Sequence, residues 1–223
     1  GLYGIATGMT FPLLFVPTTL VGSLSMAIIP DLSTAQTNND AGHVKNRTSS
    51  SIAFALFIST FLVPLYIAVG EQVGMFFYDN ATSGKLLARF AWVMIPMGLN
   101  NISTAILNGL GLEMKSFINS LLGSVLMILG ALILPKFVGI DALGYSLGLS
   151  MTLTALLNIR KIKKATNAPL NIFKPLLKMC LISIPVAALT SFVAGILEHF
   201  FTPFFVHAFS CSIGAIFFFL LCI

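Results

Sequence analysis

The sequence predicts an all-α membrane protein with seven transmembrane helices, and three observations lead to this class. Hydrophobic residues make up 57% of the chain and charged residues only 9%, against about 25% charged in a typical soluble domain. Long runs are free of charge, and each is close to the roughly 20 apolar residues that a helix needs to cross a bilayer. The runs are too long and too uniformly apolar for barrel strands, which alternate strictly over about 10 residues.

The apolar runs fall into two groups on either side of a basic segment. Residues 1–160 hold five spans, residues 161–174 are expected to form a basic cytoplasmic loop, and residues 175–223 hold two more spans that are rich in Phe. The chain has no initiator Met and no polar flank at either end, so we expect both ends to be cut from a longer protein. The five predicted spans of the first group cover about residues 4–29, 49–70, 90–112, 116–135 and 140–160.

Prolines and polar connectors mark where these spans break and turn. Pro12 and Pro17 are expected to interrupt the first span, because proline removes a helix hydrogen bond and bends the chain. The polar stretch 31–47 is expected to connect the first two spans, with part of it forming a helix at the membrane interface. A short turn, 135–141, should join the fourth and fifth spans into an antiparallel hairpin. The pair Gly144 and Gly148 would let their backbones approach closely.

The basic residues predict how the chain is oriented. Nine of them fall in the connectors after the first, third and fifth spans, and three fall on the other side. Basic residues are enriched in cytoplasmic loops, so the chain is predicted to begin outside and end inside a bacterial cytoplasmic membrane. The cluster at 160–164 is interpreted as a topology anchor, and the alternative is a specific site for anionic lipid. The nine predicted cytoplasmic residues are Lys45, Arg47, Lys115, Arg160, Lys161, Lys163, Lys164, Lys174 and Lys178; the other three are Lys85, Arg89 and Lys136.

Polar side chains follow one face of the third span. Asn100, Thr104 and Asn108 recur at every fourth position and therefore share one side of a helix, with Asn101 beside them. Such a face avoids lipid and points to protein or to a wet cavity. For the asparagines we favour a cavity that passes a polar, uncharged group. For Ser116, Ser120 and Ser124 of the next span, a cavity and simple helix–helix contact are equally open. Further candidates for the cavity lining are Thr18, Thr19, Arg89 and Asn119.

The sequence offers no catalytic, metal or cofactor site. No span carries a pair of carboxylates, and the three histidines are scattered. His199 and His207 are separated by a proline, which makes a shared metal-binding face doubtful. The three cysteines all fall in apolar runs and are expected to be buried thiols. No glycine-rich phosphate loop is present. We therefore predict no enzyme activity, no cofactor and no nucleic-acid partner.

Three stretches resemble the polysaccharide-export and lipid II flippases of the multidrug/oligosaccharidyl-lipid/polysaccharide superfamily. Residues 11–33, FPLLFVPTTLVGSLSMAIIPDLS, resemble the eighth helix of that family, in particular of stage V sporulation protein B and its relatives. In that group the helix ends in a step such as Pro30–Ser33 into a cytoplasmic connector. Residues 106–111, ILNGLG, resemble the turn before the eleventh helix, and residues 118–123, INSLLG, resemble the helix that follows.

The resemblance implies a place in the fold and a mechanism. The seven spans would correspond to helices eight to fourteen, which form most of the C-terminal lobe of the transporter and two extra helices. The family moves a lipid-linked saccharide from the inner to the outer leaflet by alternating access between two lobes. The expected partners are therefore the lipid-linked saccharide, membrane lipid and the missing N-terminal lobe of the same protein. The last two spans would form a lipid-facing groove for the polyprenyl tail.

One departure from the family pattern concerns the charge of the cavity. Lipid II flippases of this family carry arginines there that grip the pyrophosphate, and no span here has a basic residue at its middle. Arg89, at the start of the third span, comes nearest. A flippase for a lipid-linked saccharide is the first hypothesis. The second is a cation-coupled multidrug-type exporter of the same superfamily, and the third is a membrane-bound sugar ligase or acyltransferase, against which the short external loops argue.

Overall fold

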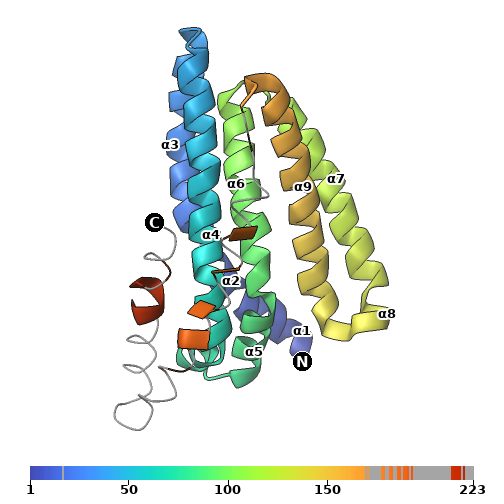
Figure 1. Cartoon of the computed structure of the whole chain (residues 1–223). Helices are drawn as coiled ribbons and strands as arrows, with labels where there is room; N and C mark the ends of the chain where they lie inside the picture. Colours follow the sequence, from blue (N-terminus) through green and yellow to red (C-terminus); the bar gives the residue numbers. More distant parts are fainter. Residues whose placement is uncertain are drawn as a thin grey trace. The chain divides into compact units, whose positions relative to one another are not determined.

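A computed structural model describes residues 1–16, 18–168 and 170, and the shorter pieces 177–178, 181–182, 185–186, 188–190, 192, 212–216 and 218. Within these residues the ordered elements are all helices, and no strand is found among them (Figure 1). The all-α class is thus confirmed. The chain folds as two compact units. Unit 1 comprises Gly1–Pro17, Thr60–Met94 and Phe173–Ile223, and unit 2 comprises Thr18–Ser59 and Ile95–Ile172.

Apolar helices long enough to cross a membrane account for most of the described residues. Four helices meet this criterion, and a fifth span is added if the bent pair Leu2–Phe15 and Thr18–Thr37 is counted as one. These five correspond to the five spans predicted for residues 1–160. The two spans predicted for residues 175–223 lie largely outside the described residues, so the count of seven stays a prediction. The four continuous spans are Ala41–Tyr78, Ala81–Gly109, Glu113–Ile133 and Pro135–Thr166.

Unit 1 begins with a helix that changes its winding as it approaches a proline. Its first elements are α1 (Leu2–Ile5), the π-helical turn η1 (Ala6–Thr10) and α2 (Phe11–Phe15). The helix ends at Phe15, before Pro17, so the interruption predicted there is confirmed. The interruption predicted at Pro12 is wrong, because Pro12 lies in the first turn of α2, where a proline needs no N–H donor. The other elements of the unit are the second part of α4 (Ala41–Tyr78), α5 (Ala81–Phe90) and the 3-10 turn η2 (Ala91–Val93).

Side chains and close backbone contacts hold unit 1 together. The Thr10 hydroxyl donates to the carbonyl of Ser83 at 3.1 Å, and Tyr66 donates to the carbonyl of Leu13 at 3.3 Å. A Cβ atom added at Gly74 would lie 2.6 Å from the Cα of Gly84, so the backbones of α4 and α5 touch there. α5 starts at the cap residue Asn80, whose side chain accepts from the Ser83 amide.

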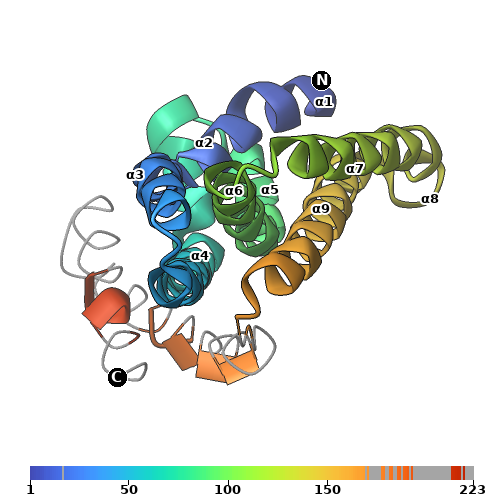
Figure 2. The ribbon, with the colours of Figure 1, turned by 90° about the horizontal axis from the view of Figure 1, so that it is seen from above.

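Unit 2 places α6 (Met94–Gly109) among the other helices of the unit (Figure 2). Gly109 of α6 lies against α3 (Thr18–Thr37), because an added Cβ would be 3.0 Å from the carbonyl oxygen of Ile29. Gly98 lies against Ser59 on the first part of α4. The remaining helices are α7 (Glu113–Ile133) and α9 (Ala142–Thr166), joined by the short helix α8 (Pro135–Val138) and the 3-10 turn η3 (Gly139–Asp141). The predicted antiparallel hairpin is therefore confirmed (Figure 1).

Two predicted connectors are shorter than the sequence indicates. α3 continues through Pro30 to Thr37, and α4 begins at Ala41, so only 38–40 connect them. Pro30 has no N–H, so the Met26 carbonyl lacks its helical donor, and helices that cross a membrane tolerate such a proline. The step Pro30–Ser33 thus lies within a helix. The second connector, between the second and third predicted spans, is also short, because α4 ends at Tyr78 and α5 begins at Ala81.

The basic cluster lies on a helix, which corrects the prediction of a loop beginning at residue 161. α9 extends to Thr166 and therefore includes Arg160, Lys161, Lys163 and Lys164. Lysine and arginine favour helices and are stabilised near a helix C-terminus by the helix dipole. The helix stops at Asn167, whose left-handed backbone, with φ of 49°, is typical of a helix end.

Candidate functional site

A buried group of amides and hydroxyls joins three helices of unit 2. At its centre is Asn158 of α9, which has no exposed surface. Its Oδ1 accepts a hydrogen bond from Asn119 of α7 at 2.8 Å. Its Nδ2 donates to the hydroxyls of Thr104 at 3.1 Å and Ser103 at 3.3 Å, both on α6. Buried polar groups of this kind need partners, and the four residues supply them to one another.

Below this group, α7 and α9 pack through small residues. The buried positions of α7 are Ser116, Asn119, Gly123 and Gly130. A Cβ added at Gly123 would collide with the Thr154 hydroxyl, and one at Gly130 would lie 2.6 Å from the Ser146 hydroxyl. The Ser150 hydroxyl donates across the interface to the Gly123 carbonyl at 2.7 Å. Small residues allow helices to associate closely in membranes, so α7 and α9 form one tightly packed pair.

The asparagines predicted on α6 are half-buried. Asn100, Asn101 and Asn108 each keep part of their surface exposed. Asn100 donates through Nδ2 to the sulfur of Met151 at 3.3 Å. The Asn100 Oδ1 is a buried acceptor that has no donor within the described residues.

The other candidates for the cavity lining are spread over the two units. Thr104 and Asn119 belong to the network around Asn158. Thr18 is buried and Thr19 is exposed at the start of α3, in unit 2. Arg89 is exposed near the end of α5, in unit 1. The structure thus brings Thr104 and Asn119 together through Asn158, and the cavity-lining role of all these residues stays a prediction.

The three serines of α7 differ in how deeply they are buried. Ser116 is buried, Ser120 is half-buried and Ser124 is exposed. The Ser124 hydroxyl donates to the carbonyl of Ser120 in its own helix at 3.0 Å. Ser116 therefore belongs to the interface with α9, while Ser124 points away from the core of the unit.

Asn158 and Ser103 are the members of the network that sequence reasoning did not select as site residues. A usable signal was present in the spacing of α9. Ser146, Ser150, Thr154 and Asn158 recur at every fourth position, so they lie on one helix face. All four are buried. Asn158 is the last member of this series and carries an amide, which needs a hydrogen-bond partner when it is buried. The series therefore indicated that a polar side chain of another helix lies opposite Asn158.

A charged group lies where α3 and α4 approach each other. The Asp31 carboxylate is 3.0 Å from Nε2 of His43 and 2.6 Å from Nε of Arg47. All three side chains are partly exposed, so the group ties the two helices without a deeply buried charge. Among the described residues, no set of three His, Cys, Asp or Glu side chains is arranged to hold a metal ion.

Comparison with known proteins adds one finding to this geometry. The model of a protein family described as the lipid II flippase MurJ matches residues 13–216 of the chain. No curated protein and no solved structure matches it. The match covers all of the helices that form the network around Asn158.

Proposed function

The chain belongs to the lipid II flippase MurJ family, and on this basis we propose that it moves a lipid-linked saccharide across the cytoplasmic membrane by alternating access. The family's activity is the flipping of lipid II, a lipid-linked saccharide that serves in cell-wall peptidoglycan synthesis. The observation that carries the proposal is the family match over residues 13–216, which spans most of the chain.

The packing of unit 2 supports a mechanism in which helices move as bodies. Alternating access requires helices that keep their mutual contacts while the path opens on one side and then on the other. The contacts of Asn158 with Asn119 and Thr104 tie α6, α7 and α9 together. The close approach at Gly123 allows little sliding between α7 and α9. We propose that these three helices move together during transport.

The uncharged amides of α6 suit the saccharide part of the substrate. Sugar hydroxyls both donate and accept hydrogen bonds, and so do the amides of Asn100, Asn101 and Asn108. All three asparagines keep part of their surface exposed, which supports a position beside the path. We propose that this face contacts the sugar as it crosses, and that Arg89 contributes to the binding of the phosphates.

The charge distribution supports an orientation with the cluster of α9 in the cytoplasm. Arg160, Lys161, Lys163 and Lys164 lie on the last turns of α9. Lys85 lies on α5, which follows the C-terminal end of α4. Its ammonium is 3.5 Å from the Glu71 carboxylate. By the positive-inside rule, we place the end of α9 inside and the turn between α4 and α5 outside.

Depletion of the intact protein from cells tests the function. The expected result is that lipid-linked saccharide accumulates in the cytoplasmic leaflet and falls in the outer leaflet. The distribution is measured by adding an enzyme that modifies only the saccharide on the outer surface. Normal outer-leaflet levels, with altered drug resistance instead, would favour a multidrug-type exporter and contradict the proposal.

A further inference from the structure

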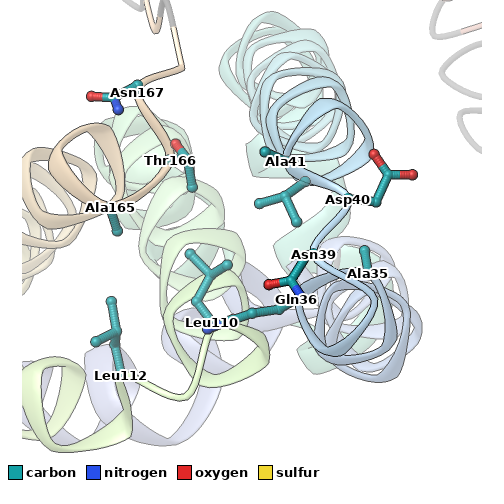
Figure 3. A pocket seen from close by; sticks show the side chains of 11 residues that line it. Ala35, Gln36, Asn39, Asp40, Ala41, Leu110, Leu112, Ala165, Thr166 and Asn167 are labelled. Atoms are coloured by element: carbon teal, nitrogen blue, oxygen red, sulfur yellow. The ribbon is translucent and has the colours of Figure 1, made fainter.

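A pocket of about 390 Å³ lies at one end of unit 2, where three chain segments come together. It is lined by the turn between α3 and α4, by the turn between α6 and α7, and by the end of α9 (Figure 3). Ligand pockets commonly have volumes of about 300–1,000 Å³, so this one would accept a small group such as a sugar ring. It lies apart from the network around Asn158, since Asn158 does not line it.

The side chains in the pocket are suited to an uncharged, hydroxyl-bearing group. Gln36 and Asn39 supply two amides, and Leu110 and Val44 supply apolar surface. The Thr166 hydroxyl also lines the pocket, but it already donates to the Ile162 carbonyl at 2.9 Å and accepts from the Ala168 amide at 3.3 Å. Amides beside apolar side chains match a sugar, which has hydroxyls around its edge and C–H groups on its faces. Asp40 also lines the pocket, but its carboxylate points away from Thr166 and Leu110 (Figure 3). Its Oδ1 accepts from the backbone amide of His43 at 2.9 Å.

Basic residues follow the pocket lining on three helices. Lys45 comes directly after the lining residue Val44, and Lys164 directly precedes Ala165. Leu112 is followed by Glu113 and then by Lys115, so α7 carries one charge of each sign there. All three lysines are exposed. A surface with several lysines attracts anionic headgroups at the membrane surface. The amides of the lining and the lysines near it together fit a headgroup that has both a sugar and a phosphate.

We propose that this pocket binds the saccharide of a phosphate-linked glycolipid at the cytoplasmic surface, before the lipid is moved across the membrane. This inference rests on the proposed function, because the substrate class and the orientation come from it. Gln36 and Asn39 hold the sugar, and the neighbouring lysines attract the phosphates. An anionic phospholipid offers the same phosphate without the saccharide, so the two sources of phosphate are separated by the test.

Protection of a cysteine in the pocket tests the proposal directly. In the intact protein with Cys180, Cys211 and Cys222 replaced by serine, Ala165→Cys places a thiol in the lining. The protein is reconstituted in phosphatidylcholine nanodiscs and treated with a water-soluble thiol reagent. The probes are lipid II, the polyprenyl pyrophosphate without sugar, and phosphatidylglycerol. At lipid II ten times above its Kd, labelling should slow about tenfold by simple occupancy, and the two lipids without sugar should protect much less.

Two variants identify the side chains that recognise the sugar. Gln36→Ala combined with Asn39→Gly removes both amides, and glycine tolerates the left-handed backbone at residue 39, where φ is 55°. In this variant the extra protection by lipid II should be lost. The matched control, Ser33→Ala with Asn38→Ala, changes exposed neighbours that do not line the pocket and should keep the protection. A thiol at Lys161→Cys, outside the lining, should be labelled at one rate with every lipid.

The outcomes separate this proposal from the proposed function. Equal protection by lipid II and by the pyrophosphate without sugar would overturn the saccharide site, and equal protection by phosphatidylglycerol would reduce the pocket to a general site for anionic lipid. Transport of lipid II without any protection of the thiol would also overturn the site while leaving the function intact. Protection by lipid II without transport would contradict the proposed function and leave the pocket as a binding site.

Discussion

Asn158 joins α9 to two other helices, although the sequence pattern did not select it as a site residue. It is fully buried, and its amide contacts side chains of both α6 and α7. In an apolar surrounding, a buried amide without partners is costly, and the cost falls on the partners when the amide is removed. The same contacts fix where Asn119 and Thr104 lie. The stability of unit 2 should therefore depend on this residue.

Asn158→Ala should lower the free energy of unfolding by about 1–3 kcal/mol, because it leaves Asn119 and Thr104 without their buried partner. Unfolding in detergent, followed by circular dichroism as a denaturing detergent is added, measures the change. Thr152→Ala is the control, since the Thr152 hydroxyl donates only to the Gly148 carbonyl of its own helix in the described structure. Equal losses of unfolding free energy in the two variants would contradict a specific contribution of the network to stability.

Gly123 gives a second prediction at the residue scale. Gly123→Ala should lower the free energy of unfolding by about 1–3 kcal/mol, because the new methyl group overlaps Thr154 at a tightly packed interface. The same detergent titration measures it. Gly22→Ala on α3 is the matched control: its methyl group meets nothing within 4 Å, and replacing glycine within a helix is favourable by about 0.5–1 kcal/mol. A stable Gly123→Ala variant would contradict the close packing of α7 and α9.

At the scale of elements, the group of Asp31, His43 and Arg47 ties the end of α3 to the start of α4. Both contacts reach across the short turn 38–40, which also forms part of the pocket wall. Partly exposed ion pairs contribute little to global stability, about 0.2–1 kcal/mol. Their effect should therefore be seen locally, in the opening of the turn.

Asp31→Asn should speed hydrogen exchange of the backbone amides in 34–44 by about two- to fivefold, the range that corresponds to an exposed ion pair. Mass spectrometry of the exchanged protein measures it. Arg47→Gln should have a smaller effect, because it leaves the contact between Asp31 and His43. The double variant should exchange little faster than Asp31→Asn, which already weakens both contacts. The difference between Asp31→Asn and the native protein should shrink at 1 M salt. Additive effects that persist at high salt would contradict an electrostatic link between α3 and α4.

The sequence predicted which segments form helices better than it predicted where those helices end. Charge-free runs and Pro17 identified the five spans of 1–160, because a bilayer sets a minimum length for each. The ends were missed at Thr37 and Thr166, since the threonines and lysines there look like loop residues in sequence but continue the helices in the structure. α3 also continues through Pro30, although a proline in sequence favours the end of a helix.

The candidate site was predictable only in part, because spacing shows which residues share a helix face but not which faces meet. Asn100, Thr104 and Asn108 were placed on one face, and they are partly buried together on α6. Whether Thr104 faces a cavity or a partner depends on α9, which is 54 residues away in sequence at Asn158. Helix contacts over such distances are set by tertiary packing.

At the scale of the whole molecule, the orientation of the chain gives a further prediction. With the three native cysteines replaced by serine, a thiol at Lys163→Cys should react with a membrane-impermeant reagent only after the cells are opened. A thiol at Lys85→Cys should react in intact cells. The physical reason is the retention of the basic end of α9 in the cytoplasm. The reverse pattern would contradict the proposed orientation and would move the pocket to the outer surface.

The central claim is that this chain serves to move a lipid-linked saccharide across a bilayer. The most direct measurement reconstitutes the intact protein in liposomes with fluorescent lipid II on both leaflets and follows how much becomes accessible to an enzyme added outside. The account predicts that lipid II of the inner leaflet becomes accessible with the protein and stays protected in liposomes without it. Equal accessibility with and without the protein would contradict the claim.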